Sequence, residues 1–214
     1  MFWTESVLFL PILLEGLRLT VIVTIGSMLL STVLGLVWAL MRVSGIKWLA
    51  LFATGLVNLI RGIPIIVQLF YIYFVLPELG ITLSAVQAAI IGLGIAYSAY
   101  QSENFRAGIE AIDHGQIEAA QSLGMGWVMM MRRVVLPQAV KIVLPPYGNT
   151  MIMMLKDSSQ ASTITVAELA LKGQMLASST FKYSTVFTLV ALLYLVMSVP
   201  LIVFVGWLER RAKK

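Results

Sequence analysis

The chain has 214 residues, of which 59% are hydrophobic and 12% charged, and its mean hydropathy is +0.93. This composition leaves too little polar surface for a soluble globule and indicates a membrane protein. The chain has no cysteine and a single histidine, His114, which excludes disulfides, thiol catalysis and zinc sites built from cysteines or a histidine cluster. We interpret the net charge of +5 as a marker of membrane topology rather than of nucleic-acid binding.

Five segments meet or approach the roughly 20 apolar residues that a helix needs to cross a bilayer. They are residues 17–41, 48–76, 85–103, an interrupted segment within 141–171, and 183–208. Arg61, Gly62 and Pro64 interrupt the second segment, and Lys156 and Asp157 interrupt the fourth. Such breaks are tolerated at membrane depth only where protein or water surrounds them. The sequence therefore predicts an all-α membrane protein with five transmembrane helices in one domain, residues 1–214.

Basic residues are concentrated in the regions that follow the first, third and fifth predicted spans. They are Arg42, Lys47, Arg106, Arg132, Arg133, Lys141, Arg210, Arg211, Lys213 and Lys214. The connection 77–84 has no basic residue, whereas Lys172 and Lys182 fall in the connection before the fifth span. Because basic residues favour the cytoplasmic side, we expect the amino terminus outside and the carboxyl terminus in the cytoplasm.

A polar stretch at 115–139 separates the third and fourth spans and predicts two short helices joined by a turn. Residues 116–123 make about two helical turns, with Glu118 near the positive end of the helix dipole. Gly124 and Gly126 supply the tight backbone conformations that end a helix. Residues 127–135 are expected to form a second helix that stops before Pro137.

We interpret this hairpin as a surface that docks into a partner. Ala119 and Ala120 keep one face thin, the methionines 129–131 offer adaptable apolar contacts, and Arg132 and Arg133 offer charged contacts at the rim. The alternative is an amphipathic loop that rests on the membrane surface.

The motif Glu118-Ala119-Ala120, with Gly124 four residues later and then Leu136-Pro137, resembles the EAA loop of ABC-type importer permeases. Three further segments resemble those of polar amino acid permeases. They are Arg61-Gly62-Ile63-Pro64-Ile65, then residues 99–103 with Arg106 and Gly108-Ile109, and then residues 155–159 followed by 166–169. Ile63 and the pair Asn104-Phe105 depart from the common pattern of these relatives. Nearly the whole chain is thus similar to permeases of the type I ABC importer fold.

The resemblance implies a coupling loop at about 110–139 that docks onto a separate ATPase. The implied docking residues are Gln116, Glu118, Ala119, Ala120, Leu123 and Gly124. The implied partners are an ABC ATPase subunit dimer, an external solute-binding protein, a second permease copy or paralogue, a polar amino acid and the lipid of a bacterial inner membrane. We expect no cofactor, no metal and no nucleic acid.

The sequence contains no GxxxxGK[ST] phosphate loop, so the chain is not expected to hydrolyse ATP itself. A different class of function is an ion-gradient transporter, whose mark would be an inverted repeat with paired broken helices. A membrane scaffold or sensor without transport is a third class.

Polar residues within the predicted spans are the candidates for a substrate pathway, because a charge at membrane depth costs about 2.5 to 3.5 kcal/mol on insertion scales. The predicted pathway residues are Arg61, Tyr97, Tyr100, Glu103, Gln160 and Glu168. Lys156 and Asp157 are interpreted as setting the bend of the fourth span. Arg61 is either part of a gate or interface or a snorkelling side chain. Glu168 either meets a substrate ammonium group or lies solvated at the outer mouth.

Overall fold

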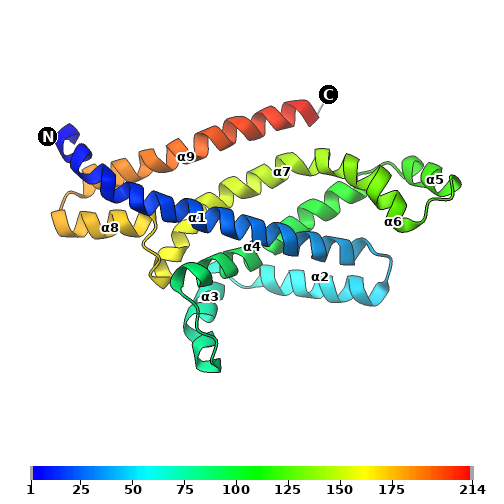
Figure 1. The fold of residues 1–214 in the computed structure, drawn as a ribbon, viewed down its shortest axis with the longest axis horizontal. Coiled ribbons are helices and arrows are strands. Elements are labelled where there is room, and N and C mark those ends of the chain that lie inside the picture. The colour runs from blue at the N-terminus through cyan, green and yellow to red at the C-terminus, as the bar shows by residue number, and fades with distance from the viewer. Residues whose placement is uncertain (1, 213–214) are drawn as a thin grey trace.

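The computed structural model describes residues 2–212, which are helical apart from short connections and contain no strand (Figure 1). The α-helices are α1 (Phe2–Val43), α2 (Lys47–Gly62), α3 (Ile65–Phe70), α4 (Ala85–Glu110), α5 (His114–Ser122), α6 (Trp127–Met130), α7 (Leu136–Asp157), α8 (Leu169–Thr180) and α9 (Tyr183–Ala212). Two π-helical turns, Tyr71–Val75 and Met131–Val135, and two 3-10 segments, Leu76–Leu79 and Ser158–Ile164, complete them. The predicted all-α class is confirmed.

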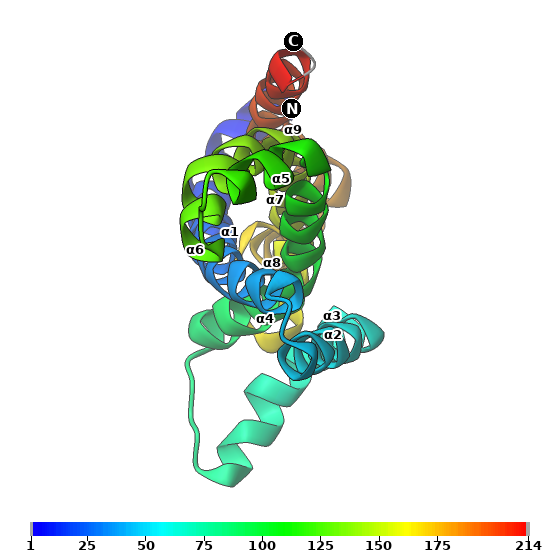
Figure 2. The same cartoon turned by 90° about the vertical axis from the view of Figure 1, so that its right-hand side faces the viewer.

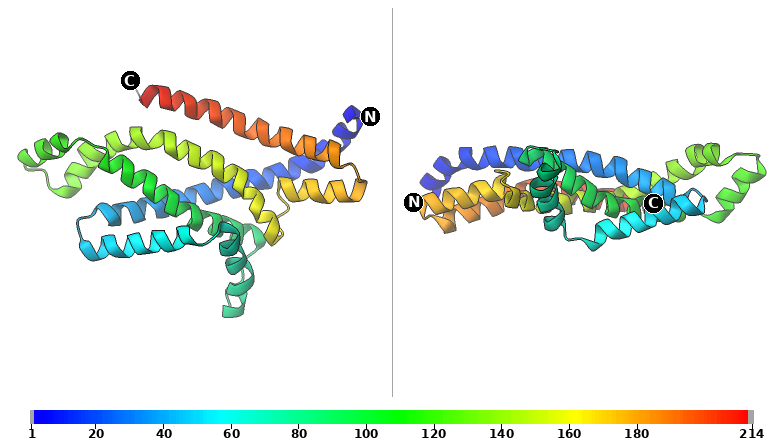
Figure 3. Two further views of the ribbon diagram at one scale, coloured as in Figure 1. Left: turned by 180° about the vertical axis from the view of Figure 1, so that it is seen from behind. Right: turned by 90° about the horizontal axis from the view of Figure 1, so that it is seen from below.

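The long helices run roughly along one axis of the molecule. α1 extends over most of this axis, α8 lies near its start, and the hairpin of α5 and α6 forms the opposite end (Figures 1 and 3). α9 begins near α8 and runs toward the hairpin end. α4 packs against α1, α2, α3 and α7, and α1 also packs against α2, α7, α8 and α9.

Glycines allow α1 and α4 to approach each other closely. A Cβ atom added to Gly35 of α1 would lie 2.7 Å from the Cβ atom of Gln101, and one added to Gly94 of α4 would lie 2.6 Å from Leu30. Small residues at helix contacts are the usual means of tight packing between membrane helices. The contact between α1 and α4 therefore depends on these residues having no side chain.

Among residues 2–212, two helices are long and apolar enough to cross a membrane, Trp3–Val43 and Tyr183–Arg211. A third candidate is the bent pair Lys47–Gly62 and Ile65–Leu79, whose halves meet at 97°. α4 and α7 are long but less apolar on average. The number of five spans therefore stays a prediction.

The predicted interruption of the second span is confirmed at Gly62–Pro64. The side-chain amide of Gln68 donates to the carbonyl oxygens of Ile60 and Ile63, at 2.9 Å each. It thus bonds one carbonyl group at the end of α2 and one within the break. The segment beyond the bend projects from the long helices (Figure 2), while Leu69 and Ile72 at its start are buried against α4. It exposes the aromatic side chains of Phe70, Tyr71 and Phe74.

The predicted break of the fourth span is also confirmed, since α7 ends at Asp157 and a 3-10 segment follows. The hydroxyl groups of Ser158 and Ser159 donate to the carbonyl oxygens of Leu155 and Lys156, at 2.7 and 2.8 Å. The serines thus bond backbone carbonyls at the end of the helix.

Two helices are longer than predicted. α1 begins at Phe2 rather than near residue 17, and α4 continues past Glu103 to Glu110. The added residues include acidic side chains that have cationic partners: Glu5 pairs with Lys182 at 2.8 Å, and Glu15 pairs with Lys172 at 3.0 Å. The two lysines that departed from the predicted charge pattern are thus each paired with a carboxylate.

We predict opposite effects for two glycine substitutions. Gly35→Ala should lower the free energy of unfolding by about 1–3 kcal/mol, because its methyl group has no room against α4. Gly55→Ala in α2 meets no atom within 4 Å and should leave stability unchanged or raise it by about 0.5–1 kcal/mol. Thermal unfolding of the purified protein in detergent measures both. Equal melting temperatures for the two variants would contradict the packing argument.

Candidate functional site

The first helix of the hairpin has defined ends. The carboxylate of Asp113 accepts a hydrogen bond from the N–H of Gly115 at 2.7 Å and caps the start of α5. At the other end Gly124 is left-handed, with φ of +73°. Its N–H donates to the carbonyl of Gln121, and the N–H of Met125 donates to that of Ala120. This is the Schellman arrangement, so the predicted role of Gly124 is confirmed, whereas Gly126 has an extended backbone and precedes α6.

The prediction that the second helix stops before Pro137 is wrong. α6 continues through the π-helical turn Met131–Val135 into α7, and Pro137 lies in the first turn of α7. The N–H of Leu136 donates to the carbonyl of Met131, five residues earlier. A proline lacks an N–H and clashes with the carbonyl four residues before it in a regular α-helix. The wider turn just before Pro137 relieves this constraint.

The hairpin has its own apolar core, which includes some of the residues predicted to face a partner. Ala120, Met130 and Met131 are buried together with Ile109, Ile112, Val135 and Ala139. For these three residues the predicted exposure is wrong, because they hold the two arms of the hairpin together. The other predicted docking residues, Gln116, Glu118, Ala119, Leu123 and Gly124, are exposed.

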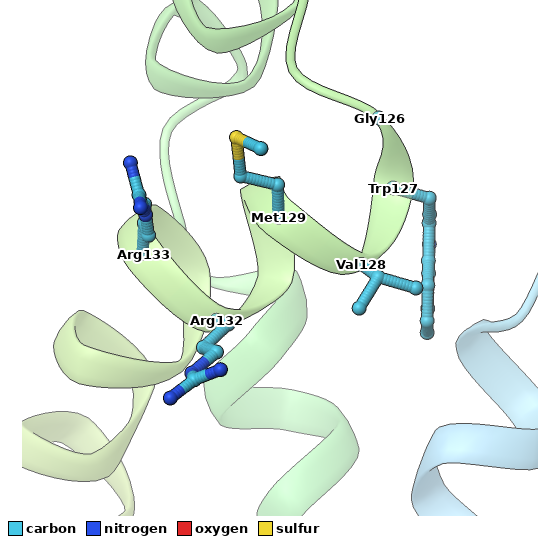
Figure 4. Close-up of a pocket in the computed structure, with 6 residues that line it drawn as sticks. All are labelled: Gly126, Trp127, Val128, Met129, Arg132 and Arg133. Atoms are coloured by element: carbon cyan, nitrogen blue, oxygen red, sulfur yellow. The ribbon is translucent and has the colours of Figure 1, made fainter.

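The exposed face of the hairpin combines apolar and basic side chains. Leu123 is 77% exposed and Val128 is 72% exposed. A shallow recess of about 710 Å³ is lined by Gly126, Trp127, Val128, Met129, Arg132 and Arg133 (Figure 4). The two arginines project from the turn after Met129, on the side of the recess away from Trp127. An apolar surface with a basic rim at the end of the molecule is suited to contact with a protein partner.

A second candidate site is a pocket of about 320 Å³ where α2, α4 and α7 meet. Its lining residues are Arg61 from α2, Tyr97, Tyr100, Glu103 and Asn104 from α4, and Pro146, Asn149, Thr150 and Met153 from α7. Four of the six predicted pathway residues are thus brought together. Gln160 lies half-buried in the 3-10 segment, and neither it nor Glu168 lines the pocket.

Glu103 is the centre of an ion-pair cluster at one wall of this pocket. Its Oε1 atom accepts hydrogen bonds from Arg42 at 2.9 Å and from Arg61 at 3.3 Å. Its Oε2 atom accepts from Nε and Nη2 of Arg106 at 3.1 and 2.9 Å, and Arg106 also pairs with Glu110. The cluster connects the end of α1, the end of α2 and α4. Pairing of this kind offsets the cost of placing ionised groups between membrane helices.

Arg61 lies at the interface between α2 and α4. Its side chain is 43% exposed, and its guanidinium lies 5.7 Å from the centre of the Tyr100 ring. A cation at this distance from an aromatic face is attracted to it. Arg61 thus contacts both Glu103 and Tyr100 of α4, and its role as part of a gate or interface stays a prediction.

Two other polar residues connect α4 to α7. The hydroxyl of Tyr97 donates to Asp157 at 2.7 Å, close to the break after α7. The amide of Asn104 donates to the side-chain oxygens of Gln101 and Thr150, each at 3.0 Å. Asn104, one of the departures from the family pattern, is also among the residues that line the pocket.

The structure places Glu168 in a different environment from either reading of the sequence. The residue is fully buried and caps the start of α8, where its oxygens accept from the N–H groups of Ala170 and Leu171 at 2.9 Å each. The hydroxyl of Tyr194 donates to it at 3.0 Å and that of Thr20 at 3.4 Å. The reading as a solvated charge at the outer mouth is wrong. The acceptor sites of the carboxylate are occupied by protein donors, so we assign Glu168 a structural role.

Sequence reasoning missed the pocket wall contributed by α7. Pro146, Asn149, Thr150 and Met153 recur at the three- and four-residue spacing that places side chains on one face of a helix. Tyr97, Tyr100 and Asn104 recur at the same three- and four-residue spacing on α4. Polar residues at this spacing in two long helices were the sequence signal that could have predicted the two walls of the pocket.

The comparisons with known proteins agree with this fold. Residues 7–214 match the family described as binding-protein-dependent transport system inner membrane component. A probable amino-acid ABC transporter permease of Sinorhizobium fredii is 38% identical, over 91% of this chain and 84% of its own length. A probable glutamine ABC transporter permease of Bacillus subtilis is 37% identical, over 94% and 93%.

Solved structures show the same similarity. A chain of the crystal structure of an amino acid ABC transporter with histidines superposes with a TM-score of 0.89 at 39% identity, covering 97% of both chains. The inward-facing methionine ABC transporter superposes with a TM-score of 0.79 at 22% identity, over 96% of this chain and 98% of its own, which shows a shared fold. The helices, the hairpin and these matches define a permease subunit of the ABC-importer class. The chain belongs to the family of binding-protein-dependent transport system inner membrane components.

We predict that Glu168→Ala destabilises the protein. It leaves buried donors without an acceptor, at a cost of about 1–3 kcal/mol for each unsatisfied group. The control is Glu15→Ala, which removes an exposed ion pair worth about 0–1 kcal/mol. Thermal unfolding in detergent compares the two. A Glu168→Ala protein with normal stability and lost transport would restore the substrate role.

Proposed function

We propose that this chain is the membrane subunit of an ATP-driven importer that carries a polar amino acid. An external solute-binding protein delivers the substrate, and a separate ATPase dimer supplies the energy through the hairpin. The observation that carries the proposal is the exposed apolar and basic face of the hairpin at one end of the molecule. The names of the relatives, which include amino-acid and glutamine permeases, support the substrate class.

We propose that the pocket between α2, α4 and α7 forms the part of the substrate pathway that this chain contributes. Its volume of about 320 Å³ falls within the range of roughly 300–1,000 Å³ for small-molecule sites. Its lining combines the ionised Arg61 and Glu103 with neutral polar side chains and the apolar Met153. A zwitterionic amino acid needs such mixed partners.

The proposed topology places the hairpin and the carboxyl terminus in the cytoplasm and the amino terminus outside. The basic residues Arg132 and Arg133 are exposed on the hairpin, and the final turns of α9 run toward the same end (Figure 1). The lysines near the other end are paired with glutamates. A second copy or a paralogue is expected to complete the pathway.

Cysteine labelling tests this topology in a chain that has no native cysteine. Ser178→Cys, in the exposed part of α8, should react with a membrane-impermeant maleimide added to intact cells. Gln116→Cys, on the exposed face of the hairpin, should react only after the membrane is permeabilised. Labelling of Gln116→Cys in intact cells would reverse the proposed orientation.

The function is tested by reconstituting the chain with its ATPase and binding protein in liposomes. Uptake of a labelled amino acid should require ATP and should persist when ion gradients are collapsed with ionophores. Uptake driven by a sodium or proton gradient in the absence of ATP would favour the ion-gradient transporter. Failure of the chain to copurify with an ATPase subunit would also count against the proposal.

We predict that the left-handed backbone at Gly124 is required for coupling. Gly124→Val forces a β-branched residue into this conformation and should misalign the two arms of the hairpin, so substrate-stimulated ATP hydrolysis should fall while membrane insertion persists. Gly124→Asn is the matched control, because asparagine tolerates the left-handed region and should retain most of the activity. If substrate stimulates ATP hydrolysis equally in both variants, the left-handed backbone at Gly124 is not required for coupling.

A further inference from the structure

Arg61 has unused capacity to bind an anion. A guanidinium group has five N–H donors, and within residues 2–212 Arg61 makes one hydrogen bond, from Nη1 to Glu103 at 3.3 Å. This is the longest of the hydrogen bonds to Glu103. The side chain is also the most exposed of the three arginines in the cluster, at 43% against 11% for Arg42 and 31% for Arg106.

Glu103 does not depend on Arg61 for its charge balance. If Arg61 leaves, Oε1 keeps its bond from Arg42 at 2.9 Å, and Oε2 keeps both bonds from Arg106. The carboxylate would therefore remain paired with two guanidinium groups. An exchange of partners by Arg61 leaves no unpaired carboxylate between the helices, which is the expensive outcome in such a setting.

The cluster as a whole has an excess of positive charge. Three arginines, Arg42, Arg61 and Arg106, face two carboxylates, Glu103 and Glu110, which gives a net charge of +1. Arg61 and Glu103 are the ionised side chains among the residues that line the pocket. Arg61 is thus the point at which the excess charge reaches the pocket, and its contact with the Tyr100 ring helps to orient its planar group.

Apart from Arg61 and Glu103, the polar side chains of the lining are neutral and offer an acceptor rather than a second anion. Asn104 uses its amide N–H group for Gln101 and Thr150, which leaves its Oδ1 atom as its acceptor. Asn149 and Thr150 add further neutral polar atoms to the lining. The lining thus combines one cation, its paired carboxylate and neutral polar groups.

We propose that Arg61 binds the carboxylate of the transported amino acid by exchanging its contact with Glu103 for the substrate. The two parallel N–H groups of a guanidinium match the two oxygens of a carboxylate, a geometry that an ammonium group does not provide. This inference rests on the proposed function and adds to it the recognition of the carboxylate, a group that all amino acid substrates share.

The test measures equilibrium binding to the purified complex of the chain with its ATPase, in nanodiscs and without the binding protein. The probes are L-arginine and its decarboxylated analogue agmatine, and L-glutamine and its decarboxylated analogue 4-aminobutanamide. The wild-type complex should bind the amino acid at least tenfold more tightly than the analogue, because a charge-assisted pair contributes about 1.5–3 kcal/mol. In Arg61→Gln the ratio of the two affinities should fall to near one. The variant should bind the amino acid more weakly and the analogue as tightly as the wild type does.

Three further variants sharpen the assignment. Arg61→Lys keeps the charge without the planar fork and should give an intermediate preference. Glu103→Gln removes the competing carboxylate and should keep or raise the preference, whereas a direct contact of Glu103 with the substrate amine would weaken amino acid and analogue alike. Arg18→Gln removes an exposed arginine that does not line the pocket and should keep the wild-type ratio.

The outcomes separate the two proposals. Two results overturn the carboxylate site and leave the importer function standing. One is a tenfold preference for the amino acid that persists in Arg61→Gln. The other is the absence of this preference in a wild-type complex that transports either probe. A wild-type complex that takes up no amino acid in the liposome assay overturns the proposed function and the site together.

Discussion

Polar groups between membrane helices must find partners within the protein, because lipid offers none. This requirement explains the placement of most polar side chains described above. Gln68 bonds carbonyl groups beside the break between α2 and α3, and Ser158 and Ser159 do so at the end of α7. Glu168 bonds the free N–H groups at the start of α8. At these three places side chains form hydrogen bonds with backbone groups near the interruption of the helix.

The same requirement shapes the pocket. Glu103 would be costly between the helices without its arginines, and these arginines come from two other helix ends and from its own helix. The groups that neutralise one carboxylate thus also bring α1, α2 and α4 together at one point. A cluster with one more cation than anion holds these helices together and leaves one positive charge accessible from the pocket.

The sequence was informative where a local pattern determines structure. The glycine at 124, the proline at 64 and the charged residues near 156 marked a helix end, a bend and a break, and each was found. It was less informative where two distant segments decide the outcome. Glu168 resembles a free carboxylate until α1 and α9 bring Thr20 and Tyr194 to it. Ala120 and Met131 resemble exposed contacts until the arms of the hairpin pack together.

Pro137 shows a different limit of sequence reasoning. The rule that a helix ends before a proline assumes a regular α-helix, and a single π-helical turn removes that assumption. The consequence is mechanical. Because α6 runs through the π-helical turn into α7, the recess of the hairpin and the wall of the pocket formed by Asn149, Thr150 and Met153 lie along one helical segment, which also contains Pro145 and Pro146. A displacement of the hairpin by a docked partner would reach that wall along this helix, past Pro145 and Pro146, where backbone hydrogen bonds are missing, whereas a helix that ended at Pro137 would have separated the two by a loop.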